Sequence, residues 1–150
     1  MQGQLTPSFG DYELIDTGDF EKLERFGQYV TRRPEPQAIW RRSLPEGEWR
    51  HMADAAFLRD VRSDERGEWC LRPGMPPRWT VAYEYKDMAL RMRLGLTSFK
   101  HVGIFPEQAA NWDWLDARIR KTAAETGAAP RVLNLFGYTG VASLVAASAG

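Results

Sequence analysis

Cysteine and histidine are scarce in this 150-residue chain, which contains one cysteine and two histidines. The single cysteine, Cys70, excludes a disulfide within the chain and a zinc site built from cysteines. His51 and His101 have no ligand-like spacing, so the sequence predicts no metal site. Because Cys70 lies in the segment 67–72, away from the glycine turn described below, we expect it to be a buried structural thiol and not a nucleophile.

The chain also lacks an excess of either charge and a long apolar run. Twenty basic and twenty acidic residues give a formal net charge of zero, whereas a stand-alone nucleic-acid-binding module is usually distinctly basic. Arginine pairs such as Arg32–Arg33 and Arg41–Arg42 are compatible with phosphate contacts, but solvated surface is the simpler interpretation. With neither a secretory leader nor an apolar run of bilayer length, the sequence predicts a cytoplasmic protein that makes no membrane contact.

Residues 131–140, RVLNLFGYTG, combine a short apolar run with two glycines. The apolar residues are Val132, Leu133, Leu135 and Phe136. Such a run predicts a parallel strand buried on both faces. Gly137 and Gly140 would let a flat ligand approach the main chain. The Ala-rich segment 141–150 predicts a helix whose N-terminus faces this turn, so the whole stretch is typical of a nucleotide or nucleoside site.

The glycine spacing separates the possible ligands. A dinucleotide fingerprint needs G-x-G-x-x-G, and the chain has only Gly137-x-x-Gly140. A P-loop is excluded because no Lys-Ser or Lys-Thr follows Gly140. A fragment of an NAD- or FAD-dependent oxidoreductase therefore stays as an alternative, but the missing third glycine of the fingerprint counts against it.

Two segments resemble motifs of one enzyme family. NLFGYTG, residues 134–140, resembles motif I of the class I S-adenosylmethionine-dependent methyltransferases, in the variant found in the large-subunit rRNA 5-methylcytosine methyltransferases. HVGIFPEQ, residues 101–108, resembles the upstream G-x-F-x-D-Q element of that family, motif X, with Glu107 in place of the Asp. The family's following Arg is Ala109 here, so anchoring of the cofactor carboxylate by that Arg is not carried over.

The resemblance implies S-adenosylmethionine as the cofactor and RNA, an rRNA base, as the substrate. The implied cofactor-binding residues are Phe105, Gln108, Asn134, Phe136, Gly137, Tyr138, Thr139 and Gly140. The catalytic residues and the acid that binds the ribose would lie beyond residue 150. We therefore expect the chain to be the N-terminal part of a longer methyltransferase, inactive by itself. A non-catalytic RNA-binding module is the second alternative.

The predicted fold is α/β in two parts. Residues 1–100 should form a β-rich α+β module, and residues 101–150 the first β-α unit of a truncated Rossmann-like domain. Strands are expected at 12–16, 29–33, 55–59 and 68–72, a hairpin at 79–85 and 88–96, and helices at 20–26 and from Pro106 to about Gly127. In the helix that begins at Pro106, we expect Trp112, Leu115 and Ile119 to face inward and Trp114 to face sideways. Of the six tryptophans, most should be core, but an exposed one in the β-rich module would suit stacking on an unpaired base.

Overall fold

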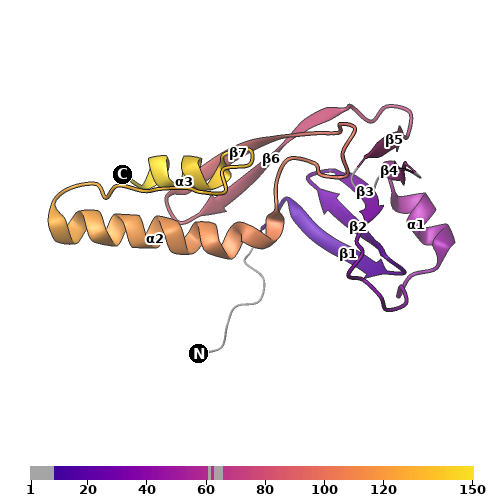
Figure 1. The fold of residues 1–150 in the computed structure, drawn as a ribbon, viewed down its shortest axis with the longest axis horizontal. Helices are drawn as coiled ribbons and strands as arrows, with labels where there is room; N and C mark the ends of the chain where they lie inside the picture. The colour runs from indigo at the N-terminus through magenta and orange to yellow at the C-terminus, as the bar shows by residue number, and fades with distance from the viewer. Residues whose placement is uncertain (1–8, 61, 63–65) are drawn as a thin grey trace. The chain divides into compact units, whose positions relative to one another are not determined.

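The structure, a computed structural model, describes residues 9–60, 62 and 66–150 (Figure 1). The chain forms a mixed α/β fold that divides into two compact units. One unit contains residues 10–81 and 93–103, and the other contains Phe9, residues 82–92 and residues 104–150. The second unit thus takes in residues 82–92, which precede the predicted domain boundary at residue 101.

A five-stranded sheet forms the first unit. Its strands are β1 (Tyr12–Gly18), β2 (Glu21–Phe26), β3 (Tyr29–Pro34), β4 (Ala55–Arg59) and β5 (Gly67–Leu71). They lie in sequence order, with antiparallel pairing everywhere except between β3 and β4. A parallel pair needs a crossover connection. Residues 35–54 form this connection and include the helix α1 (Glu46–Met52).

The four strands predicted for this region are confirmed, but the helix predicted at 20–26 is wrong. Leu23 and Phe26 have helical spacing, yet residues 21–26 form β2, which is hydrogen-bonded to strands on both sides. Tight turns at Asp19–Phe20 and at Gly27, with φ of 48°, 64° and 64°, bring the three strands together. Pairing along both edges outweighs a helical pattern of only seven residues. The helix α1 was not predicted.

Cys70 is exposed, so the prediction of a buried thiol is also wrong. Successive side chains in a strand point to opposite faces, and in β5 the buried residue is Trp69. Cys70 therefore points away from the core that Trp69 enters. The wider expectation for tryptophan is confirmed, because Trp49, Trp69, Trp79 and Trp112 are buried while Trp40 and Trp114 are exposed.

A buried ion pair joins β2 and β3. The Arg33 guanidinium donates two hydrogen bonds to the Glu24 carboxylate, at 2.6 and 3.1 Å, and both side chains are almost fully buried. Burial of Glu24 opposes its ionisation, but the charge and hydrogen bonds of Arg33 outweigh that effect and hold the pKa of Glu24 below its usual range. The pair therefore stays charged inside the sheet unit.

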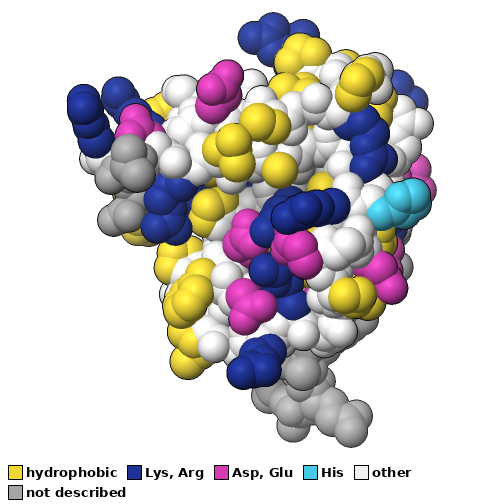
Figure 2. Space-filling view, turned by 90° about the vertical axis from the view of Figure 1, so that its right-hand side faces the viewer, with side chains coloured by type: hydrophobic (Ala, Val, Ile, Leu, Met, Phe, Trp, Pro, Cys, Tyr) yellow, Lys and Arg dark blue, Asp and Glu magenta, His cyan; other side chains and the backbone are white. Residues whose placement is uncertain are grey.

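A second polar cluster anchors the connection between β3 and α1. Arg32 pairs with Glu21 and Glu46 at 2.6 and 2.7 Å, and Arg42 pairs with Glu46 at 2.6 Å. Both guanidinium groups lie over the indole of the buried Trp49, at 5.5 and 4.6 Å from the ring centroid. On the face shown in Figure 2, acidic and basic side chains are intermingled, with no large area of one sign.

The predicted hairpin is present as β6 (Arg78–Tyr85) and β7 (Met88–Gly95). As predicted, one face of β7 is buried and the other is exposed. The buried residues are Met88, Leu90, Met92 and Leu94, and the exposed residues between them include Arg91 and Arg93. Within the second unit, Tyr83 of β6 contacts Phe9 and Trp112 edge to face, at centroid distances of 4.9 and 5.3 Å.

Two helices that lie side by side complete the second unit (Figure 1). A 3-10 turn, η1 (Pro106–Gln108), leads into α2 (Ala109–Thr126), which ends at Gly127 with φ of 71°. The helix α3 (Val141–Ala149) follows the glycine turn. In α2, Trp112 and Ile119 are buried, Leu115 is half-buried, and Trp114 is exposed, close to the prediction. No helix among the described residues has the length and apolar character needed to span a membrane.

Candidate functional site

A hollow of about 920 Å³ opens between the first half of α2 and the loop that leads into α3. Small-molecule sites commonly have volumes of about 300–1,000 Å³ and mostly apolar walls. Six of the eight predicted site residues line it, namely Phe105, Gln108, Phe136, Gly137, Tyr138 and Thr139. The fold thus brings the two motif segments, separate in the sequence, to one concave surface.

The aromatic rings of Phe105 and Tyr138 connect the two sides of this hollow. Their centroids are 4.7 Å apart and their planes are inclined by 33°. Tyr138 has a φ of 45°, a left-handed conformation that is costly for a residue with a side chain. The ring contact and the turn around it therefore hold Tyr138 in place against that cost.

The other two predicted residues, Asn134 and Gly140, shape the loop without lining the hollow. Asn134 donates from Nδ2 to Ser143 Oγ at 3.0 Å, and its Oδ1 accepts a hydrogen bond from the Phe136 N–H at 3.1 Å. Gly140 has a φ of 93°, and its N–H donates to the carbonyl of Gly137 at 2.7 Å. Asn134 therefore ties the loop to α3, while Gly140 permits the turn.

Several lining residues were missed in the sequence. They are Ile104, Asn111, Trp112, Trp114, Leu115, Leu135, Val141 and Ala142. A helical repeat was the available signal, because Gln108, Asn111 and Leu115 recur at spacings of three and four and share one face. Asn111 also donates from Nδ2 to Gln108 Oε1 at 2.8 Å, which presents two amide side chains at the start of α2.

The hollow carries little charge. Among the described residues that line it, none is Asp, Glu, His, Lys or Arg. The nearest acids in α2, Asp113 and Asp116, are used elsewhere: Asp113 accepts a hydrogen bond from the Tyr83 hydroxyl at 2.5 Å, and Asp116 pairs with Arg120 at 2.9 Å. Burial, then the Asp113 hydrogen bond and charge, raises the pKa of Tyr83, and burial raises the pKa of Asp113. The lining can bind a ligand but offers no carboxylate or imidazole to move a proton.

The described residues also show no cluster of metal ligands. No group of three or more His, Cys, Asp and Glu side chains with metal-binding geometry occurs among residues 9–60, 62 and 66–150.

The segment before the turn differs from the sequence prediction. Residues 131–136 do not form a strand, and their apolar side chains are exposed, with Leu133 at 81% and Phe136 at 89%. A parallel strand requires hydrogen-bonded neighbours and cover on both faces, and no strand formed by the described residues pairs with this segment. The predicted buried strand is therefore wrong for the chain as the structure describes it.

Comparison with models of known protein families gave no match, and comparison with curated proteins also gave none. Among solved structures, the chain is similar to the crystal structure of an S-adenosylmethionine-dependent methyltransferase from Agrobacterium tumefaciens, with 40% sequence identity and a TM-score of 0.76. The similarity covers 97% of this chain and 43% of that protein. The chain thus spans less than half the length of the methyltransferase that it matches.

Proposed function

We propose that this chain is part of an S-adenosylmethionine-dependent methyltransferase and supplies one side of the cofactor site. The observation that carries the proposal is the hollow itself, because residues from both motif segments line it. The 40% identity to a methyltransferase over nearly the whole chain supports the same conclusion. The contact between the Phe105 and Tyr138 rings joins one residue from each motif segment at this hollow.

The residues of the hollow fit the cofactor chemically. Adenosine needs an apolar slot for its flat ring, which Phe105 can flank. The amides of Gln108 and Asn111 and the Thr139 hydroxyl can bind polar groups of the nucleoside and the amino acid. A Cβ built on Gly137, which lines the hollow, meets no atom within 4 Å, so a ligand in the hollow can approach the main chain there.

The cofactor would bring a methyl group that is already activated on a sulfonium. The task left to the protein is then to hold the acceptor in line with that methyl group and to exclude water. In our proposal, residues 136–140 orient the methionine and ribose part, and Phe105 with Gln108 closes the opposite side. The catalytic residues lie outside this chain, which is therefore inactive alone, in keeping with the absence of carboxylate, imidazole and ammonium groups from the described lining.

We further propose that residues 131–136 form the first strand of a Rossmann-like sheet once further strands cover them. Their exposed apolar side chains support this, because leaving several Leu, Val and Phe residues in water costs about 1.5–3 kcal/mol for each large side chain. In this proposal, residues 1–100 are a β-rich module and residues 101–150 begin the cofactor domain. Residues 82–92 of the hairpin belong to the same compact unit as the helices of that domain.

The substrate that we propose is RNA, specifically an rRNA base. The support is the NLFGYTG variant of motif I at residues 134–140, which resembles that of the rRNA 5-methylcytosine methyltransferases. The exposed Trp40 of the β-rich unit is compatible with contact to an unpaired base. Cytoplasmic location stays a prediction from the sequence.

Saturation-transfer NMR with S-adenosylhomocysteine tests the cofactor assignment, since the method detects the weak binding expected of a partial site. We expect transfer to the adenine protons in the wild-type chain and its loss in Gly140→Val, where a β-branched residue would need a φ of 93°. Gly74→Val is the matched control, because Gly74 has a φ of 92° and equally open surroundings but lies in the other unit.

Two results would contradict the proposal. The first is no saturation transfer to S-adenosylhomocysteine, and the second is equal loss of transfer in Gly140→Val and Gly74→Val. Transfer to NAD in place of S-adenosylhomocysteine would favour an oxidoreductase. RNA binding without binding of either cofactor would favour a non-catalytic RNA-binding module.

A further inference from the structure

The loop that follows β3 carries three exposed residues, Ile39, Trp40 and Arg41, and the exposed Phe20 of the β1–β2 turn is hydrogen-bonded to this loop through its main chain. We call these four residues the Trp40 patch. We propose that the Trp40 patch is a stacking platform for an unpaired base of single-stranded RNA, with Arg41 contacting the phosphate backbone. The choice of RNA rests on the proposed function. The patch itself belongs to the five-stranded unit and can be tested without any cofactor.

Main-chain hydrogen bonds hold the patch in one shape. The Asp19 N–H donates to the Trp40 carbonyl at 2.7 Å, and the Phe20 N–H donates to the Ala38 carbonyl at 2.8 Å. These bonds clip the loop to the β1–β2 turn, where Asp19 and Phe20 both have positive φ. Two left-handed residues with side chains are costly and persist only where the surroundings fix them. The platform is therefore rigid before any ligand arrives.

The Trp40 ring is anchored while much of it stays accessible. Its indole N–H donates to the Thr17 carbonyl at 2.8 Å, yet 52% of the residue is exposed. A buried tryptophan could make the same hydrogen bond, but its ring would not be accessible to a base. An anchored, exposed ring loses little conformational freedom when a base stacks on it, so more of the stacking energy is kept as affinity.

Close packing at Gly18 positions the next two residues of the loop. A Cβ at Gly18 would lie 2.5 Å from the Arg42 nitrogen and 2.6 Å from the Arg41 carbonyl carbon. Only glycine allows this approach. The main chain of Arg41 is thus fixed against β1, next to the anchored Trp40.

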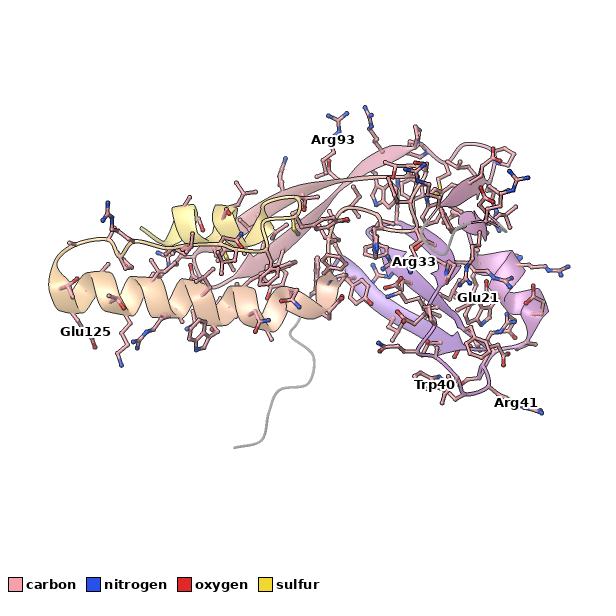
Figure 3. The ribbon with its side chains drawn as sticks, viewed as in Figure 1. Glu21, Arg33, Trp40, Arg41, Arg93 and Glu125 are labelled. Atoms are coloured by element: carbon pink, nitrogen blue, oxygen red, sulfur yellow. The ribbon has the colours of Figure 1, made fainter. Side chains whose placement is uncertain are left out.

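The charges around the loop favour a phosphate-bearing ligand. Arg42 is committed to Asp19 at 3.1 Å and to Glu46 at 2.6 Å. Arg41, in contrast, is exposed and forms no ion pair with any described residue. Figure 3 shows Trp40 and Arg41 on the same loop, with the Arg41 side chain extending away from the ribbon. A ring for stacking beside an uncompensated guanidinium matches a nucleotide, which offers both a flat face and an anionic group.

One base and its phosphate need only a small surface, and the four residues of the Trp40 patch supply a ring and a guanidinium for them. Base stacking is also tolerant of sequence, so a short oligouridylate, which stays single-stranded, is a suitable probe.

Fluorescence anisotropy of a fluorescein-labelled oligouridylate with the 150-residue chain measures the binding. We expect Trp40→Ala and Trp40→Leu to weaken it by about 5- to 150-fold, the equivalent of the ~1–3 kcal/mol that stacking of one base contributes. Trp40→Phe should keep part of the affinity, because it retains an aromatic ring for stacking but loses the indole N–H that anchors Trp40 to Thr17. In Arg41→Ala, the negative slope of log K for RNA binding against log salt concentration should become less steep by about 0.7, the contribution of one phosphate contact.

Leu58→Ala is the control, because Leu58 is similarly exposed on β4 outside the patch. Equal weakening by this variant, an unchanged affinity in Trp40→Leu, or equally tight binding of duplex RNA would each overturn the platform. The outcome is independent of the cofactor test. If Trp40→Leu loses RNA binding but the wild-type chain does not bind S-adenosylhomocysteine, the platform is supported and the cofactor proposal is not. If S-adenosylhomocysteine binds but Trp40→Leu keeps its RNA affinity, only the cofactor proposal is supported.

Discussion

Asp16 offers the sharpest test of how the loop beside β1 is held. Its buried carboxylate accepts hydrogen bonds from the main-chain N–H groups of Thr17, Ser43 and Leu44, at 2.9, 3.2 and 2.9 Å, and from the Trp49 indole N–H at 2.8 Å. Replacing Asp16 by Ala removes all four acceptor contacts. Replacing it by Asn keeps one oxygen but removes the charge.

The expected cost follows from which donors can find water in the variant. Ser43 is exposed and Thr17 half-exposed, so their N–H groups can be solvated. Leu44 is half-exposed like Thr17, so its N–H can also be solvated. The Trp49 N–H cannot, because Trp49 is fully buried, and an unsatisfied buried donor costs about 1–3 kcal/mol. We therefore expect Asp16→Ala to lower the free energy of unfolding by about 1–3 kcal/mol and Asp16→Asn by about half as much.

The same site should show in the acid dependence of stability. Burial opposes ionisation of Asp16, but the donated hydrogen bonds outweigh it and hold the pKa below the ordinary value of 3.8. A carboxyl whose pKa is lower in the folded state stabilises the fold above its unfolded pKa and loses that contribution as the pH falls through its folded pKa. Wild type should therefore lose stability on acidification below about pH 4, and Asp16→Asn should lose less.

Urea denaturation followed by tryptophan fluorescence, at pH 7 and at about pH 3, measures both effects. Asp60→Asn is the control, because Asp60 is exposed and, among the described residues, its side chain accepts a hydrogen bond only from the Arg62 N–H. It should change stability by less than about 0.5 kcal/mol. A cost below about 1 kcal/mol for Asp16→Ala, or equal acid sensitivity of wild type and Asp16→Asn, would refute the reasoning.

Two further predictions concern buried charge and the candidate site. Glu24→Gln should destabilise the chain by about 3–5 kcal/mol in urea denaturation, because it removes the carboxylate that pairs with the buried Arg33 charge. Glu13→Gln, at an exposed ion pair, should cost less than about 1 kcal/mol, and similar costs for the two variants would contradict this account. Phe105→Ala and Tyr138→Ala should show a coupling of about 0.5–1.5 kcal/mol in a double-mutant cycle of unfolding. Additive effects would mean that the ring contact does not hold the turn.

Local sequence patterns predicted the elements whose stability is mainly local. The alternation in residues 88–94 gave the β7 hairpin strand with its correct faces, and Pro106 and Gly127 bracketed the helix α2 within a few residues. Where pairing partners decide the structure, the same reasoning failed. Residues 21–26 became a strand between β1 and β3, and residues 131–136 remained exposed, with no strand among the described residues paired to them.

The candidate site shows the same division. The two motif segments predicted eight site residues from the sequence, but only the fold brought six of them to one hollow and added residues such as Asn111 and Trp114 to its lining. The side chains of a binding surface come from segments that are distant in the chain. The distances between these side chains depend on how helices and loops pack against one another. The spacing of residues along the sequence does not specify that packing.

The sequence by itself predicted the glycine turn and the helices around it and carried the family resemblance, because these rest on local residues: Gly140, for example, permits the φ of 93° that the turn adopts. Only the tertiary structure decided that Trp40 is exposed on a fixed loop and that Cys70 faces outward. Exposure depends on which segments pack against a side chain. For Trp40 that depends on main-chain bonds between residues 19–20 and the loop at 38–40, a pairing that the local sequence does not reveal.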